Sequence, residues 1–174
     1  PRWVRQSVLR DLESKLKPSD IKKYPSEDSL YKTCGSWNTD KLELISEILF
    51  WEPGDKMCLV FYLTEEDCCD PRKNKRTAYV RNVNLKDNSF YDLETFYKKH
   101  KSSIDQDVMS HVRRKYRANR ERRFINMIKI EEVPPLGFDK RGLIVFTIST
   151  IGGKNQHVPW VVSHARLPQP MPTP

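Results

Sequence analysis

The segment that most constrains the fold is a four-residue turn, EPGD, at residues 52–55. Pro stands at its second position and Gly at its third. That order is typical of a type II β-turn, whose third residue takes a positive φ. The stretches before and after it, KLELISEILFW and KMCLVFYLTEE, are dense in apolar residues. The first also fits a helix, but the turn favours an antiparallel hairpin with strands at residues 43–51 and 56–64.

The remaining apolar patterns predict helices and strands on both sides of this hairpin. Val4, Val8, Leu12 and Leu16 recur every four residues, which predicts an amphipathic N-terminal helix that ends at Pro18. Helices are further predicted at residues 19–24, 91–101 and 104–123, strands at 77–85, 124–133, 142–151 and 157–167, and loops at 26–40 and 134–142. Hairpin signals outnumber regular strand–helix–strand alternation. We therefore predict an α+β fold, a mostly antiparallel curved sheet or small β-barrel with an N-terminal helix and a central helical insertion.

The ends of the sequence suggest a piece of a longer protein. The chain begins with Pro and finishes in LPQPMPTP. We expect one globular domain over residues 1–168, and a Pro-rich tail or linker at 169–174. No apolar run approaches the roughly 20 residues of a membrane-spanning helix, so no membrane partner is expected.

Charge is distributed unevenly along the chain, which carries a formal net charge of +8. Residues 40–69 hold eight acids and two bases, whereas residues 70–130 hold seventeen bases and seven acids. Such asymmetry predicts one strongly basic surface and hence an acidic partner.

The basic charge is densest in HVRRKYRANRERRF, residues 111–124, which contains seven Arg or Lys residues and one acid. On a helix over residues 104–123, Val108, Met109, Val112 and Tyr116 would form an apolar side, with Arg113, Arg117 and Arg120 beside it. Arginine matches phosphate oxygens with paired hydrogen bonds, and each phosphate contact releases a counterion. We therefore expect nucleic-acid binding by Arg113, Arg114, Lys115, Arg117, Arg120 and Arg122, together with Arg72, Lys73, Lys75 and Arg76 on the loop before the third strand.

The basic run has two alternative roles. Its arginines could pair with the acidic segment 40–69, or the run could be a nuclear-import signal. The sequence contains no zinc-finger spacing, leucine zipper or aromatic RNA-reading motif, so we expect recognition of backbone or shape rather than of base sequence.

An aromatic pocket is the alternative binding site. Trp37, Trp51, Tyr62 and Tyr79 lie in or near the predicted sheet, and aromatic walls can hold a methylated lysine by cation–π attraction. With the nearby acidic segments they would suit a histone-like peptide, although large aromatics more often fill a core.

Catalytic and metal-binding signals are weak. No GxSxG, phosphate-binding P-loop or HExxH motif occurs. Paired acids at Asp105 and Asp107, or at Glu131 and Glu132, could hold a metal, but no further ligand stands near them. The four cysteines, Cys34, Cys58, Cys68 and Cys69, have no disulfide or zinc spacing, and we expect free thiols.

The sequence thus predicts a non-enzymatic, DNA- or RNA-binding module of a larger nuclear, chromatin-associated protein, with no cofactor and no metal. The cytoplasm is the alternative location. A protein-interaction domain that binds a peptide is the alternative function.

Overall fold

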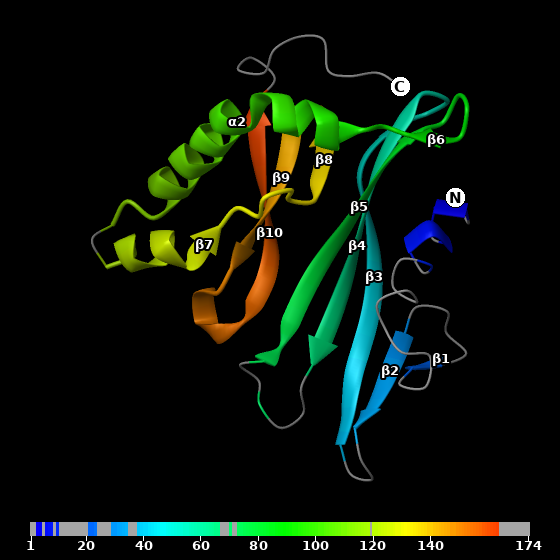
Figure 1. Ribbon diagram of the computed structural model, residues 1–174, viewed down its shortest axis with the longest axis horizontal. Helices are drawn as coiled ribbons and strands as arrows, with labels where there is room; N and C mark the ends of the chain where they lie inside the picture. The colour runs from blue at the N-terminus through cyan, green and yellow to red at the C-terminus, as the bar shows by residue number, and fades with distance from the viewer. Residues whose placement is uncertain are drawn as a thin grey trace.

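Ten described strands pair in one sheet, which forms the frame of the protein (Figure 1). The computed structural model describes residues 3–4, 6–8, 10, 21–23, 29–34, 38–66, 70, 73–118 and 120–163. The strands are β1 (Ile21–Lys23), β2 (Ser29–Cys34), β3 (Asn38–Glu52), β4 (Lys56–Glu66), β5 (Lys75–Asn84), β6 (Ser89–Phe90), β7 (Ile128–Lys129), β8 (Leu136–Asp139), β9 (Gly142–Ser149) and β10 (Asn155–Ser163). Their main order is β1-β2-β3-β4-β5-β10-β9-β7, with β6 paired to β5 and β8 to β9. This confirms the predicted α+β fold, in the form of a curved sheet, and the described strands do not close into a barrel.

The hairpin predicted from EPGD is confirmed. Strands β3 and β4 pair antiparallel on either side of the turn. The turn is closed by the Asp55 amide, which donates to the Glu52 carbonyl at 3.1 Å, and Gly54 has a φ of +72°. Strand β5, which confirms the third strand predicted at residues 77–85, pairs antiparallel with β4.

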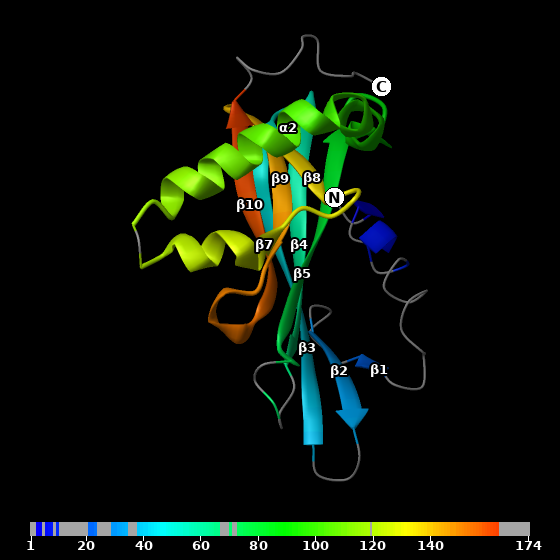
Figure 2. The same ribbon diagram turned by 60° about the vertical axis from the view of Figure 1, so that its left-hand side comes forward.

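Strand β10 joins this meander to the rest of the sheet through a very short parallel pairing. Only Asn155 and Gln156 of β10 pair with β5, opposite Lys75 and Arg76. Every other pairing between described strands is antiparallel. The two halves of the sheet therefore diverge beyond this contact, and the strands β8–β10 fold over one face of β3–β5 (Figures 1 and 2).

Strand β4 is covered on both faces, because its side chains point alternately to the two faces and pack into hydrophobic clusters on each. Met57, Leu59, Phe61 and Leu63 pack with Val4 and Val8 of the N-terminal helical residues. On the opposite face, Cys58 packs with residues of β8, β9 and the long helix, and Val60 and Tyr62 pack with Ile144 and Phe146 of β9. Burial of Val4 and Val8 confirms the amphipathic N-terminal helix in its described part; Leu12 and Leu16 lie outside the described residues.

Strand β8 approaches β4 so closely that a side chain at position 137 would displace its neighbours. A Cβ built there would lie 2.9 Å from Cys58 Sγ and 3.3 Å from Val80 Cγ1. Cys58 is a free thiol that accepts a hydrogen bond from the Phe138 amide at 3.4 Å. Burial raises its pKa to about 12, so the thiol stays neutral. The other three cysteines lie outside the residues whose side chains are described.

One helix, α2 (Leu93–Lys115), replaces the two helices predicted between residues 91 and 123. Non-helical angles at His100 kink it where the two were expected to separate. Asp92 caps its start by accepting from the Thr95 amide. Its apolar side is confirmed, because Val108 and Val112 are fully buried and Met109 and Tyr116 pack against the same cluster. No helix among the described residues is long and apolar enough to span a membrane.

Helix α2 ends at Lys115, eight residues earlier than predicted, so the rest of the basic run lies outside the helix. Tyr116 instead contacts Phe124, with ring centroids 5.7 Å apart. A continuing helix would separate these two residues by about 12 Å along its axis. The tertiary contact therefore requires the chain to reverse, and a 3₁₀ helix, η3 (Arg122–Met127), follows the turn.

Four short segments were predicted wrongly. Strand β1 occupies part of the predicted helix 19–24, and β2 part of the predicted loop 26–40. In the predicted strand 124–133, residues 124–127 belong to η3, only Ile128 and Lys129 form a strand (β7), and residues 130–133 are irregular. Strand β8 lies in the predicted loop 134–142. These short strands are defined by pairing with a neighbour, which local apolar periodicity does not report.

The burial pattern of α2 predicts a large loss of stability for a substitution at one residue and a small loss for a substitution at the next. Val112 is fully buried, whereas Arg113 is exposed. Val112→Asp should lower the free energy of unfolding by about 4 kcal/mol or more, because a carboxylate is buried without a partner. Arg113→Asp should cost about 1 kcal/mol or less, mainly through the helix dipole. Urea unfolding followed by circular dichroism measures both, and an equal loss in the two variants would contradict this packing of α2.

Candidate nucleic-acid interface

The basic turn, defined here as residues 113–123, is the densest positive feature of the protein. It comprises the last turn of α2, a reversal of the chain and the start of η3. Its seven cationic residues are all exposed: Arg113, Arg114, Lys115, Arg117, Arg120, Arg122 and Arg123. Because α2 ends at Lys115, Arg117 and Arg120 lie in the reversal and do not share a helical flank with Arg113, which corrects the sequence-based prediction.

None of these seven residues forms an ion pair with a carboxylate of the described residues. Two described acids of segment 40–69 have other partners: Glu52 lies 3.4 Å from Lys56, and Asp55 lies 2.6 Å from Lys86. The lower ends of β2 and β3 also lie far from the end of α2 in both views (Figures 1 and 2). Among the described residues, internal pairing therefore does not neutralise the basic turn.

Aromatic rings position two of the cations without neutralising them. Lys115 Nζ lies 5.3 Å from the ring centroid of Trp160 on β10. The Arg123 guanidinium carbon lies 5.1 Å from the ring centroid of Phe124. Such cation–π contacts restrict the side chains and leave their full charge available to solvent or to a ligand.

The second predicted cluster lies at the start of β5. Lys75 and Arg76 are the first two residues of that strand, and both are exposed. Lys73 is exposed just before the strand, and Arg72 lies outside the described residues. The Arg76 guanidinium carbon sits 3.9 Å from the Tyr62 ring centroid. Here the chain forms a cleft of about 330 Å³, lined by Ile45, Thr64, Asn74, Lys75, Arg76, Lys154, Asn155 and Gln156.

The fold brings the two basic clusters to one side of the molecule. One register row crosses four strands, from Ile128 on β7 through Ser149 and Gln156 to Arg76 on β5. At about 4.8 Å per strand, Ile128 and Arg76 are roughly 14 Å apart. Both views place the β9–β10 hairpin between η3–β7 and the start of β5 (Figures 1 and 2). Exposed Lys129 and Lys154 lie along this path.

Lys129 and Lys154 are cations of this surface that sequence reasoning missed, as are the amides Asn155 and Gln156 of the cleft. Each cation is isolated in the sequence, so no charge run marks it. The pairing of β10 with β5 and of β7 with β9 brings them to the basic surface. Only knowledge of the strand order could have identified them.

Of the four aromatics predicted for a peptide site, the three that the structure describes do not lie together. Tyr62 packs with β9 on one face of β4, whereas Tyr79 packs with the cluster on the other face. Trp51 is 60% exposed near the β3–β4 turn, about four residues further along the strands than Tyr79. Trp37 lies outside the described residues.

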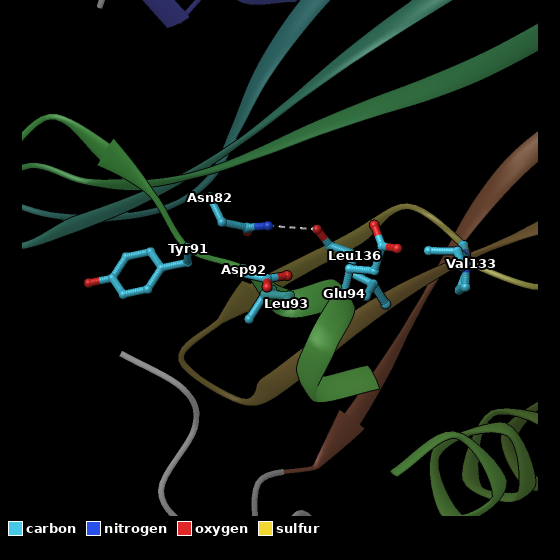
Figure 3. A pocket seen from close by; sticks show the side chains of 8 residues that line it. Asn82, Tyr91, Asp92, Leu93, Glu94, Val133 and Leu136 are labelled. Carbon is cyan, nitrogen blue, oxygen red and sulfur yellow. Dashed lines mark hydrogen bonds between the residues drawn. The ribbon is translucent and has the colours of Figure 1, made fainter. Parts of the chain in front are cut away.

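A different pocket, of about 240 Å³, opens at the start of α2 (Figure 3). Tyr91, Val133, Pro134 and Leu136 supply apolar walls, with Asp92, Leu93 and Glu94 on the helix. Asn82 is buried beside it and donates to the Leu136 carbonyl at 2.8 Å, while its Oδ1 has no hydrogen-bond partner among the described residues. Asp92 already caps α2, and Glu94 pairs with Lys98, so both carboxylates of this pocket are engaged.

His157 connects the basic surface to the interior. Its Nδ1 accepts a hydrogen bond from the Ala78 amide of β5 at 2.8 Å, so the ring proton is on Nε2, which donates to Glu131 Oε2 at 3.1 Å. Backbone pairing between β5 and β10 stops after Gln156. The His157 imidazole links the two strands at the next residue, through its hydrogen bond with the Ala78 amide. Burial lowers the His157 pKa; nearby Glu131 opposes this shift and nearby Lys75 adds to it.

No metal cluster is evident in the part of the chain that the structure describes, where no three His, Cys, Asp or Glu residues converge. Asp105, one of the acids considered as a metal ligand, instead binds the Tyr97 hydroxyl and Lys101. Glu131 binds His157.

Comparison with protein-family models, with curated proteins and with solved structures finds no match for this chain. A function for this protein is therefore inferred from its fold and its surface alone.

The bond from Ala78 to His157 predicts a loss of stability in mild acid. The folded protein holds His157 neutral with a lowered pKa, so the unfolded chain binds more protons below about pH 6.5. The free energy of unfolding should therefore fall as the pH drops from about 7 towards 5. His157→Gln should weaken this dependence, because an amide oxygen can accept from Ala78 without titrating.

His100→Gln is the matched control, since His100 packs beside Phe96 and bridges no strands. Urea unfolding of the three proteins at several pH values gives the comparison. An equal slope in wild type and His157→Gln would contradict the assigned role of the imidazole.

Proposed function

We propose that this protein binds nucleic acid through the sugar–phosphate backbone, using the basic turn and the start of β5. The observation that carries the proposal is the set of exposed cations in residues 113–123 without an ion-pair partner among the described residues. Uncompensated cations repel one another, and a polyanion that binds them releases its condensed counterions. Arginine, which supplies six of the seven, is the side chain best suited to phosphate.

Helix stability alone does not account for this charge. Cations in the last turn of a helix interact favourably with its dipole, which suffices for Arg113, Arg114 and Lys115. The effect fades within one turn, yet Arg117, Arg120, Arg122 and Arg123 lie beyond the end of α2. A ligand with several regularly spaced negative charges accounts for the whole set.

The proposed contacts would position the protein without reading sequence. Phosphate contacts orient a protein on nucleic acid but carry no base information. A non-enzymatic role in a nuclear, chromatin-associated protein suits such binding. The only support for this nuclear role is the same basic surface. The alternative role of the basic run, as a nuclear-import signal, has the same support.

Peptide binding is the second candidate. The pocket at the start of α2 favours it, because the Oδ1 of Asn82 is a buried acceptor without a partner among the described residues, beside apolar walls. A ligand there would supply a hydrogen-bond donor, such as an amide or an ammonium group. The commitment of Asp92 and Glu94 to α2 leaves little acidic charge for a histone-like tail.

Removal of two arginines of the basic turn should weaken nucleic-acid binding uniformly. We predict that Arg114→Ala/Arg117→Ala lowers affinity for duplex and single-stranded oligonucleotides of unrelated sequence alike. The slope of log affinity against log salt should become shallower by about one for each contact removed. The melting temperature should change little, because both side chains are exposed. Fluorescence anisotropy at several salt concentrations measures affinity and slope.

The matched control is Lys99→Ala/Lys140→Ala, which removes two exposed charges elsewhere. Lys99 lies about 20 Å from Arg114 along α2. The control should bind with the wild-type salt slope. Wild-type protein that binds no oligonucleotide at low salt, or a control that loses as much as the arginine variant, would contradict the proposal.

A further inference from the structure

The cleft at the start of β5 is formed by the parallel pairing of β5 and β10. Parallel strands begin at the same edge of a sheet, so the residues that precede both strands meet there. The Asn155 amide donates to the Asn74 carbonyl at 3.3 Å and closes this edge. Gly152 and Gly153, with φ of +75° and +76°, form the turn that directs Lys154 to the same place.

The lining of the cleft combines three kinds of group. Lys75, Arg76 and Lys154 are exposed cations that pair with no carboxylate of the described residues. Glu65 stands opposite Lys75 in the strand register, but the two form no ion pair among the described contacts. The side chains of Asn155 and Gln156 carry both donors and acceptors, and Ile45 is a 48%-exposed apolar side chain.

Arg76 is held in place before any ligand arrives. Its guanidinium lies 3.9 Å from the ring centroid of Tyr62, which is largely buried against Phe146 and the β9 side of the sheet. Stacking on a fixed ring reduces the entropy that a long side chain loses on binding. A guanidinium in this position can stack on a base or hydrogen-bond a phosphate.

The size of the cleft selects among nucleic acids. At about 330 Å³ it lies at the lower end of the range for small-molecule sites. One base with its sugar and phosphate is a ligand of that class, whereas a base pair between two backbones is not. Bases are open to such contact only where the strand is unpaired.

We propose that this cleft binds one unpaired nucleotide of a single strand whose backbone follows the basic surface. This inference rests on the proposed function and adds a preference for single-stranded nucleic acid. Lys75, Lys154 and Arg76 would hold the phosphate, the amides of Asn155 and Gln156 would bond the base edge, and Ile45 would pack on the base face. The phosphates would then extend over the β9–β10 hairpin towards the basic turn.

A charge-neutral variant tests the cleft separately from backbone binding. Asn155→Ala/Gln156→Ala removes two amides and keeps every cation. Affinity for a 12-nucleotide single strand should fall about tenfold, in line with the loss of two hydrogen bonds to the base edge. Affinity for the 12-base-pair duplex, and for a single strand of equal length made of abasic sites, should stay within about threefold of wild type. Gln6→Ala/Gln106→Ala, which removes two exposed amides elsewhere, should bind all three ligands as wild type does.

The outcomes distinguish the two proposals. A cleft variant that binds the normal single strand as wild type does, or that loses equally on duplex and abasic strands, overturns the cleft assignment while backbone binding stands. Wild-type protein that binds none of the oligonucleotides overturns both. If adenosine monophosphate binds as tightly as the single strand does, the cleft is a site for a free nucleotide, and the proposal that it binds a nucleotide within a strand is wrong.

Discussion

The burial of strand β4 on both faces is the constraint on which the rest of the structure depends. From Met57 to Leu63 every residue of β4 is buried, with odd and even positions on opposite faces. A hairpin alone covers neither face, so the chain must supply two layers. The N-terminal helical residues cover one face, and strands β8 and β9 cover the other. Strand β9 is then buried on both of its own faces, and α2 packs outside it. Gly137 permits the closest approach in this stack, where β8 lies against Cys58.

This layering explains where the charge lies. The buried side chains of α2 are aliphatic or aromatic, and the helix ends where Tyr116 and Phe124 meet. The seven cations of residues 113–123 are therefore exposed at the edge of the stack, on the end of α2, the reversal and the start of η3. The β9–β10 hairpin extends from the same layer and carries Lys154 to Lys75 and Arg76. His157 fastens this hairpin to β5 through the Ala78 amide and to Glu131, which follows β7. The basic surface is thus attached to the sheet, although Arg117, Arg120 and Lys154 lie outside helices and strands.

Long, strongly patterned segments were predictable from the sequence, and short ones were not. EPGD and its flanking strands, β5, β9, β10 and the buried face of α2 follow from local apolar periodicity and turn chemistry. The length of the basic helix was not predictable, because a contact between Tyr116 and Phe124 overrides local helix preference. For the candidate site, the sequence identified the charge runs containing Arg113 and Arg76. It could not place them on one side, nor find Lys154, Asn155 and Gln156, because those neighbours depend on the parallel pairing of β10 with β5.

The central claim is that residues 113–123 and the cleft at β5 form one nucleic-acid-binding surface. Chemical-shift mapping of backbone amides during titration with a 12-nucleotide single strand tests it most directly. The predicted result is a contiguous set of shifts in residues 113–123, in the β9–β10 turn and at Lys75 and Arg76, with none in the β3–β4 turn. Shifts confined to the pocket around Asn82 and Leu93, or scattered without regard to the basic surface, would contradict it.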